Sequence, residues 1–310
     1  MEHRAFAKIP TLLSESAGGG RWVATEKIHG AQLVVATDGE LVMLGKRKAW
    51  LAADEPFFGW QLLRNELEVA ILAIHAALGH AATIHIYGEL FGGGYPHPDV
   101  EPLPGLTPVQ TGIWYAPTLR FAAFDLLVVP AEDEPVFIAH EQLEALAEQV
   151  GLLTVPVLGR GTRRELIDLP VRYPSTVAGL LGLPALADNV AEGYVLKPDT
   201  ELPARARPLV KHKIPEFDEN RFDESMPFDH HAQLSIAELL RWAAVMINPV
   251  RIASARSKVG EDPTAIAEEV ALDVWIDLES IYPRRMLALD PDEDAEVRTA
   301  LLELASAAVG

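Results

Sequence analysis

Cysteine is absent from this chain of 310 residues. Its absence excludes disulfide bonds, zinc sites built on thiolates and cysteine nucleophiles. Long apolar runs are missing as well, because no stretch approaches the roughly 18 uncharged residues that span a bilayer. The first residues, MEHRAFAKIPTLLSES, carry charges and lack the sustained apolar core of a signal peptide. We therefore expect a soluble, cytoplasmic protein that does not cross a membrane.

Positive charge is scarce. Lysine and arginine number 26 against 45 acidic residues, and the formal net charge is −19. Affinity for nucleic acid comes largely from lysine and arginine at phosphates, so this deficit by itself argues against a nucleic-acid partner. Local clusters matter more than the total, however, and basic residues gather at 45–48 and between 195 and 213. The sequence therefore still allows a nucleic-acid partner at one basic face.

The first 230 residues mix strand-like and helix-like patterns. Short runs of strand-forming residues predict strands at 22–28, 31–36, 41–47, 82–91, 120–129, 192–198 and 208–214. Apolar residues at helical spacing predict helices at 60–78 and 139–151. A loop rich in glycine and proline, 92–117, is too long for a simple connection.

After about residue 235 the pattern becomes helical. Segments at 235–247, 263–282 and 293–309 have helical spacing, with few strand-like runs between them. The stretch DENRFDESMPFDHHAQ, 218–233, has the composition of a linker. We therefore predict an α+β domain over residues 1–230 and a small all-α domain over residues 235–310.

The stretch VATEKIHGAQLVV, 23–35, places charged residues between two strand-like runs. A lysine nucleophile must be neutral, which requires burial or nearby positive charge to lower its pKa from about 10.4. Lys27 on a strand, followed by a glycine that lets a phosphate approach, meets this need. Considered alone, an exposed strand lysine paired with Glu26 explains the stretch better.

A second candidate site is the run Asp229-His230-His231. It would suit a metal-dependent phosphoesterase, but it lies in the predicted linker and no other Asp/His cluster on a strand supports it. The other histidines show no zinc-ligand spacing.

Six short motifs follow one another along the chain: EKIHG, GKRK, IYGELFG, FAAFDLL, EGYVLKP and LVKHK. This series resembles the covalent nucleotidyltransferase superfamily, which comprises ATP-dependent ligases and mRNA capping enzymes. The form E-K-x-H-G resembles the phage RNA ligase 2 family, which includes the kinetoplastid RNA-editing ligases. The resemblance covers residues 26–213 and implies a nucleotidyltransferase (ATP-grasp-like) domain of antiparallel sheets with flanking helices.

The resemblance implies a role for each matching residue. Lys27 would attack the α-phosphate of ATP and carry AMP, and Phe124 would stack on the adenine, with Phe121 as the alternative in a shifted register. Glu192 would be associated with the divalent metal, Mg²⁺ or Mn²⁺. The other implied ATP- or AMP-binding residues are Glu26 and Ile28 at the adenine edge, Glu89 at the ribose, Arg47 at a phosphate or the ribose, and Lys197, Lys211 and Lys213 at the α-phosphate.

Lys211 and Lys213 stand two apart on a strand, so they share a face, and both are implied catalytic residues. The RNA 5′-phosphate or the phosphate loop would contact His29, Gly30, Gln32 and Arg47. The family commonly follows H-G with Thr-Asn, whereas this chain has Ala31-Gln32, which affects the later chemical steps more than the first.

The predicted helical tail separates three interpretations. DNA ligases and capping enzymes usually carry a β-rich OB-fold there, whereas the phage RNA ligase 2 family carries a small helical domain. We therefore expect an ATP-dependent RNA ligase, monomeric, that acts on RNA ends in nicked duplex RNA or an RNA–DNA hybrid. An ATP-dependent DNA ligase or broad-specificity nick sealer without an OB-fold is the nearer alternative. A catalytically silent relative that binds nucleotide or RNA ends is the other.

Overall fold

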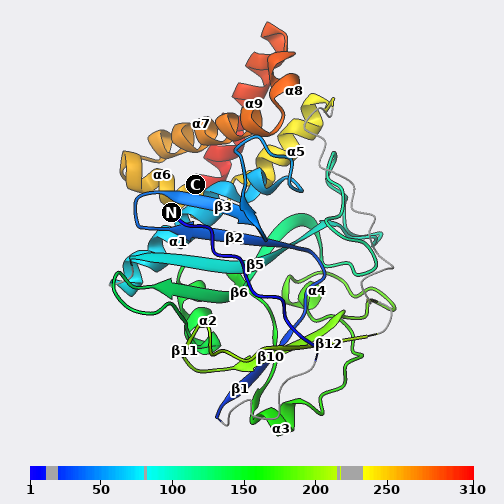
Figure 1. Cartoon of the computed structure of the whole chain (residues 1–310). Helices are drawn as coiled ribbons and strands as arrows, with labels where there is room; N and C mark the ends of the chain where they lie inside the picture. The colour runs from blue at the N-terminus through cyan, green and yellow to red at the C-terminus, as the bar shows by residue number, and fades with distance from the viewer. Residues whose placement is uncertain (12–19, 80–81, 215–216, 218–232) are drawn as a thin grey trace. The chain divides into compact units, whose positions relative to one another are not determined.

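The computed structural model describes residues 1–11, 20–79, 82–214, 217 and 233–310 (Figure 1). The chain divides into two compact units, and each is built from more than one stretch of the chain. The first unit comprises Met1–Leu51, Ala70–Glu101 and Pro108–Met226, and the second comprises Ala52–Val69, Pro102–Thr107 and Pro227–Gly310.

Two sheets form the first unit. The smaller has the strand order β12-β10-β1-β9, and the larger has the order β11-β7-β6-β5-β2-β3-β4, with β8 added beside β6. Among the described strands, all pairings are antiparallel except that of β6 with β8.

The strands of the smaller sheet are β1 (Trp22–Glu26), β9 (Val157–Gly161), β10 (Gly193–Pro198) and β12 (Val210–Lys213). Those of the larger sheet are β2 (Ala31–Thr37), β3 (Val42–Lys46), β4 (Ala49–Trp50), β5 (Thr83–Gly94), β6 (Ala116–Val129), β7 (Val136–Phe137), β8 (Leu153–Thr154) and β11 (Leu202–Pro203). The long strands β5 and β6 run side by side along the middle of the larger sheet (Figure 1).

Short helices complete the first unit. They are α2 (His140–Gln149), α3 (Arg163–Leu166) and α4 (Val177–Leu180). The helix α1 (Arg64–Leu78) follows the 3₁₀ turn η1 (Trp60–Leu63), and its residues from Ala70 onward belong to the first unit. A capping box between Thr162 and Glu165 starts α3, which satisfies backbone N–H groups that a helix start leaves without partners.

The second unit is helical. Its main helices are α5 (Ile236–Met246), α6 (Pro249–Val259), α7 (Pro263–Ile281), α8 (Pro283–Leu287) and α9 (Pro291–Val309). Four of them, α6, α7, α8 and α9, begin with a proline, which is compatible with the first turn because its missing N–H would have no partner within the helix. Asn248, Asp262 and Asp290 cap α6, α7 and α9 with their side chains.

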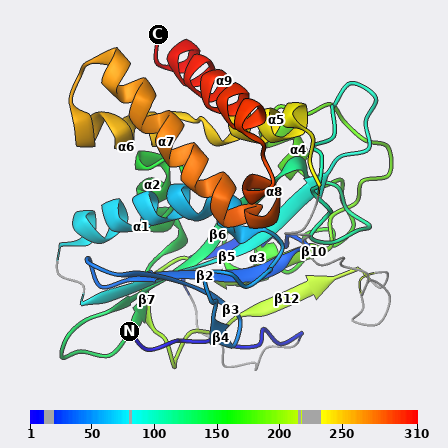
Figure 2. The ribbon, with the colours of Figure 1, turned by 90° about the horizontal axis from the view of Figure 1, so that it is seen from above.

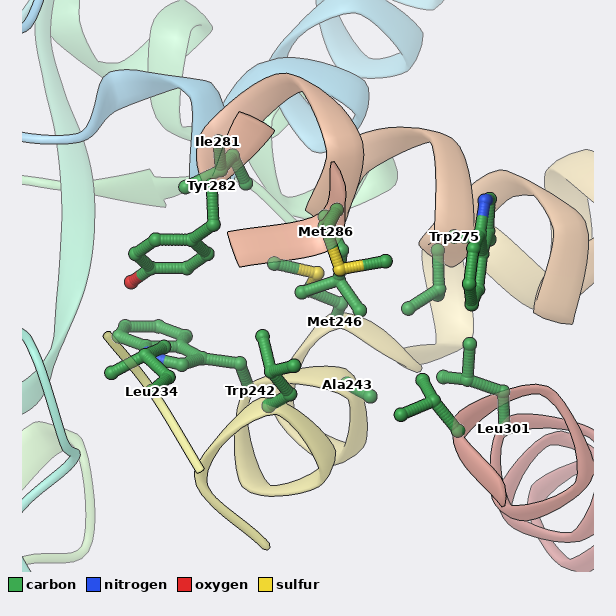
Figure 3. Close-up of a cluster of buried hydrophobic side chains, with 13 residues drawn as sticks. Leu234, Trp242, Ala243, Met246, Trp275, Ile281, Tyr282, Met286 and Leu301 are labelled. Carbon is green, nitrogen blue, oxygen red and sulfur yellow. The ribbon is translucent and has the colours of Figure 1, made fainter. Parts of the chain in front are cut away.

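A buried apolar cluster holds the second unit together. Trp242 and Met246 of α5 meet Tyr282 and Met286, and Leu301 of α9 closes the cluster (Figure 3). Trp242 also donates a hydrogen bond of 2.8 Å from its indole Nε1 to the carbonyl oxygen of Pro104. This contact helps to explain why residues 102–107 belong to the helical unit. The sequence prediction, which divides the chain near residue 230, assigns these residues to the first domain.

The α+β architecture and the helical C-terminal region agree with the sequence prediction. Each predicted strand and helix has a counterpart whose ends are shifted by a few residues. The sequence patterns did not predict α6, nor the strand β9 that completes the smaller sheet. The predicted linker at 218–233 lies outside the described residues except for Gln233, and the run Asp229-His230-His231 is outside them entirely.

Candidate active site

The EKIHG motif forms the connection between the two sheets. Strand β1 of the smaller sheet ends at Glu26, and strand β2 of the larger sheet begins at Ala31. The backbone N–H of Lys27 donates to the carbonyl oxygen of Gly193 at 2.8 Å, and the backbone N–H of His29 donates to the Tyr115 hydroxyl at 2.8 Å. Hydrogen bonds to Gly193 and Tyr115 therefore hold the backbone of this connection at Lys27 and at His29.

Two glycines permit this geometry, for different reasons. A Cβ on Gly30 would lie 2.2 Å from the carbonyl oxygen of Leu90, so Gly30 allows the crossover to press against β5. Gly193 has a φ of 144°, and a Cβ there would lie 1.9 Å from the carbonyl oxygen of His212. Gly30 thus has a packing role in addition to the phosphate-approach role expected from the sequence.

Glu192 is the centre of the site. Its buried carboxylate accepts from Lys27 Nζ at 2.8 Å on Oε2 and lies 2.5 Å from Lys213 Nζ on Oε1. His29 Nδ1 lies 3.6 Å from Oε2. Burial would raise the pKa of Glu192, but Lys27, the hydrogen bond with His29, and Lys213 outweigh it and lower that pKa to about 2. The carboxylate is therefore fully ionised at neutral pH and orients two lysines of different motifs.

The Glu26 side chain has partners that the sequence patterns did not indicate. Its carboxylate accepts from Ser175 Oγ at 2.6 Å, from Thr176 Oγ1 at 2.7 Å and from the Thr176 backbone N–H at 2.9 Å. Glu26 is buried, so these three bonds satisfy a charge that would otherwise be costly. Ser175 and Thr176 are separated from Glu26 by about half the chain, and no local motif marks them.

Glu89 and Gln32 lie opposite each other on β5 and β2. Burial raises the pKa of Glu89 to about 7, against the opposing effect of Lys27. A carboxyl group near half protonation both donates and accepts hydrogen bonds, which suits hydroxyl groups such as those of a ribose. The buried amide Nε2 of Gln32 has no hydrogen-bond partner among the described residues, so it is available to a ligand.

Phe124 is the extra residue of a β-bulge. Tyr87 of β5 pairs with Asp125, and the next residue, Gly88, pairs with Ala123, so Phe124 is left out of the ladder. Its ring is partly buried and packs against the apolar cluster that contains Ile28 and Ala122.

Phe121 lies on the other face of β6. It directly precedes Ala122, and successive side chains of a strand point to opposite faces. Its ring covers Gly88, where an added Cβ would lie 2.2 Å from a ring carbon. The structure thus places Phe124, and not the alternative Phe121, on the face that carries Ile28.

Lys197 is engaged elsewhere. It lies four residues along β10 from Gly193, about 13 Å at the ordinary strand rise. Its Nζ donates to Asp125 Oδ1 at 2.9 Å and to the carbonyl oxygen of Phe124. In the structure Lys197 therefore links the two sheets and does not join the carboxylate of Glu192.

The Asp125 carboxylate also accepts from Arg207 Nη2 at 2.5 Å. Burial would raise the pKa of Asp125, but Arg207 and Lys197 outweigh it and hold that pKa below its ordinary value. Burial lowers the pKa of Lys197 to about 8, against the effect of Asp125. Asp125, Lys197 and Arg207 therefore form a buried ion-pair cluster next to the Phe124 bulge.

The remaining residues named from the sequence lie around this site. Arg47 is exposed in the turn between β3 and β4, directly after Lys46, which pairs with Leu33 near the start of β2. Lys211 and Lys213 alternate with His212 on β12, and the Lys211 backbone N–H donates to Pro10 at 3.0 Å. The structure therefore brings Lys27, His29, Lys213 and Glu192 into direct contact, with Arg47 and Lys211 at the margin.

The donor set fits a divalent metal held in part by substrate. The described residues contain no group of three or more His, Asp or Glu side chains that could hold a metal ion by themselves. Mg²⁺ commonly binds through one or two carboxylates together with substrate phosphates and water. The carboxylate of Glu192, which contacts the ammonium groups of Lys27 and Lys213, is compatible with that description.

In this fold a connection that carries Lys27 joins two sheets, and two lysines contact one buried carboxylate. These features agree with the nucleotidyltransferase class that the motifs indicated. A family model described as RNA ligase matches residues 20–213, and the chain belongs to this RNA ligase family.

The curated relatives include two mitochondrial RNA-editing ligases of Trypanosoma brucei brucei. RNA-editing ligase 2 is 32% identical over 200 residues, which is 57% of this chain and 48% of that protein. RNA-editing ligase 1 is 29% identical over 223 residues, which is 62% of this chain and 47% of that protein. The chain spans about half the length of both relatives.

Solved structures of a Naegleria gruberi RNA ligase are also similar. A variant with ATP and Mn has a TM-score of 0.44 and 16% identity, over 66% of this chain and 52% of that one. The same ligase with PPi has a TM-score of 0.41 and 15% identity, over 64% of this chain and 51% of that one. Within the described part of the chain, none of the helices has the length and apolar character needed to cross a membrane.

Proposed function

We propose that this chain is an ATP-dependent RNA ligase that works through a covalent lysyl-AMP on Lys27. The observation that carries the proposal is the pair of lysines, Lys27 and Lys213, on opposite oxygens of the buried Glu192 carboxylate. Membership in the RNA ligase family supports the reaction class. The cofactors are ATP and a divalent metal, Mg²⁺ or Mn²⁺, which is consistent with ATP and Mn in the Naegleria gruberi structures.

In the first step Lys27 Nζ attacks the α-phosphorus of ATP. A phosphorus–nitrogen bond forms, the bond between the α-phosphorus and the bridging oxygen breaks, and pyrophosphate leaves with that electron pair. Only the neutral amine has a lone pair, so Lys27 must first lose the proton that its ion pair with Glu192 stabilises. A divalent metal, held in part by Glu192, would neutralise triphosphate charge and would favour the neutral amine.

Other residues position the nucleotide. Phe124 stacks on the adenine beside Ile28, and Glu89 and Gln32 offer hydrogen-bonding groups on one face of the larger sheet. Glu26 acts through its backbone and its packing, because Ser175 and Thr176 occupy its carboxylate. Lys213, with Lys211 beside it, stabilises the charge that grows on the α-phosphate.

In the later steps AMP passes to an RNA 5′-phosphate, and a 3′-hydroxyl then attacks that end and releases AMP. We propose that the ends lie in nicked duplex RNA or an RNA–DNA hybrid, in the course of RNA repair. The exposed Arg47 and the site residues His29, Gly30 and Gln32 would contact the 5′-phosphate. The names of both curated relatives place those proteins in mitochondria. A cytoplasmic location and a monomeric state of this chain stay predictions.

The test is labelling with α-labelled ATP and Mg²⁺ or Mn²⁺, followed by a denaturing gel. The wild type should keep label, Lys27→Ala should lose it, and Lys258→Ala, in a helix of the second unit, should retain it. Labelled enzyme should then pass AMP to nicked duplexes. Comparing a nick with a ribose 3′-end against one with a deoxyribose 3′-end distinguishes an RNA ligase from a DNA ligase. Absence of label in the wild type with either metal would contradict the proposal.

A further inference from the structure

Residues Glu2–Pro10, called the N-terminal segment below, cross the face of the first unit. The family model begins at residue 20, so this segment lies outside the matched region. At one end the His3 ring is 2.9 Å from the carbonyl oxygen of Lys46, next to Arg47. At the other end the carbonyl oxygen of Pro10 accepts from the Lys211 N–H on β12.

The middle of the segment is fixed to β5. Tyr87 donates from its hydroxyl to the carbonyl oxygen of Arg4 at 2.8 Å, and the His85 ring lies 3.2 Å from the carbonyl oxygen of Glu2. Figure 1 shows the segment as a dark blue trace that passes over the larger sheet toward β12, and in Figure 2 it lies on the same side as β3, β4 and β12. The segment therefore spans both sheets.

Phe6 is the buried anchor of the segment. The residue is 6% exposed, and its ring meets the Phe124 ring edge-on, with centroids 5.1 Å apart and an interplanar angle of 73°. The rings of Tyr87 and Phe137 lie at 5.1 Å and 5.8 Å. Phe6 thus supports one side of Phe124, while Phe124 also packs against the cluster around Ile28.

Phe124 needs such support more than an ordinary strand residue does. As the extra residue of a bulge it is outside the regular ladder, so the neighbouring strand does not fix its direction. The carbonyl oxygen of Phe124 is held by Lys197, and its ring is held by Phe6. The ring direction therefore depends on a segment far away in sequence.

We propose that Phe6 is a positioning residue for nucleotide binding: the N-terminal segment holds the Phe124 ring at the angle that stacks on the adenine. The inference rests on the proposed function for the identity of the nucleotide and for the stacking role of Phe124. Aromatic pairs of this geometry are worth enough to change an affinity about two- to tenfold.

The test measures the dissociation constant for ATP by calorimetry in the presence of Mg²⁺. The variants are Phe6→Leu, Phe124→Leu and the double variant, with Ile71→Ala as the control for core packing, since Ile71 of α1 is buried in the same unit. Melting temperatures are recorded for all of them. If Phe6→Leu does not fold, Phe6→Met replaces it, because methionine adapts to the cavity.

Phe6→Leu should weaken ATP binding two- to tenfold, and adding it to Phe124→Leu should change the dissociation constant less than twofold. Ile71→Ala should lower the melting temperature but leave the dissociation constant unchanged. The positioning role would be overturned if the two phenylalanine substitutions raised the dissociation constant for ATP by factors that multiply in the double variant. It would also be overturned if Phe6→Leu left that dissociation constant unchanged. A wild type that binds ATP with this coupling but forms no lysyl-AMP would defeat the proposed function alone. A wild type that does not bind ATP would defeat both.

Discussion

Replacement of Glu192 by glutamine should destabilise the protein in a pH-dependent way. The folded state holds the pKa of Glu192 at about 2, against 4.5 for an ordinary glutamate. At about 1.4 kcal/mol for each tenfold change in proton affinity, this difference corresponds to about 3 kcal/mol of stability at neutral pH. Glutamine has no charge, so Glu192→Gln should lose most of that stability.

The sign of the pH effect follows from the lowered pKa. Well above pH 4.5 the carboxylate is ionised in both the folded and unfolded states, and its full contribution is present. As the pH approaches 4.5 and falls on toward 2, the unfolded state takes up the proton first, and the contribution is progressively lost. The stability difference between wild type and Glu192→Gln should therefore shrink by about 1 kcal/mol between pH 7 and pH 4.

The assay is urea denaturation followed by far-ultraviolet circular dichroism at several pH values. Separate transitions are fitted if the two units unfold separately. Glu134→Gln is the matched control, because Glu134 pairs with the exposed Arg205 and should contribute little. A stability difference for Glu192→Gln below about 1 kcal/mol at pH 7, with no narrowing at pH 4, would refute the central role of this carboxylate.

Three further predictions concern the surroundings of the site. Gly30→Ala should reduce lysyl-AMP formation at least about tenfold, because the added Cβ meets the Leu90 carbonyl oxygen, whereas Gly179→Ala, with open space around it, should not. Labelling rates and melting temperatures check this pair. Arg47→Lys should slow labelling or nick sealing without changing the melting temperature, because Arg47 is exposed and lysine would keep the charge but not the proposed bidentate contact with a phosphate. RNA binding, measured by filter retention, should be weak because of the net charge of −19, and it should fall steeply with salt because the affinity comes from lysine and arginine contacts to phosphates; an affinity unchanged between low and moderate salt would contradict this.

The sequence predicted the two strands on either side of the His29–Gly30 pair and most of the long elements, because these carry local signals, but it did not predict that the two strands belong to different sheets. The motif order identified Lys27 and Glu192, and the structure brings the two side chains together at 2.8 Å. The start of α6 also carries a local signal, Asn248 followed by a proline, although its apolar residues do not mark a helix.

Other features have no local signal. The strand β9 is short and contains two glycines, so it shows neither alternation nor strong strand propensity. Ser175 and Thr176 are ordinary loop residues until the fold brings them to Glu26. The partner of Lys197 was also unpredictable, since it depends on which face of β6 carries Asp125, and a bulge decides that.

The bulge at Phe124 shifts, by one residue, which side chains of β6 point to each face of the sheet. In a regular strand, residues three apart point in opposite directions. Here Ala122 pairs with Glu89 and Asp125 pairs with Tyr87, and those two partners are two residues apart on β5, so Ala122 and Asp125 share a face. Deleting one residue from this part of β6 would turn either the apolar wall or the buried carboxylate away from the smaller sheet. The number of residues in this part of β6 therefore decides which side chains face the smaller sheet.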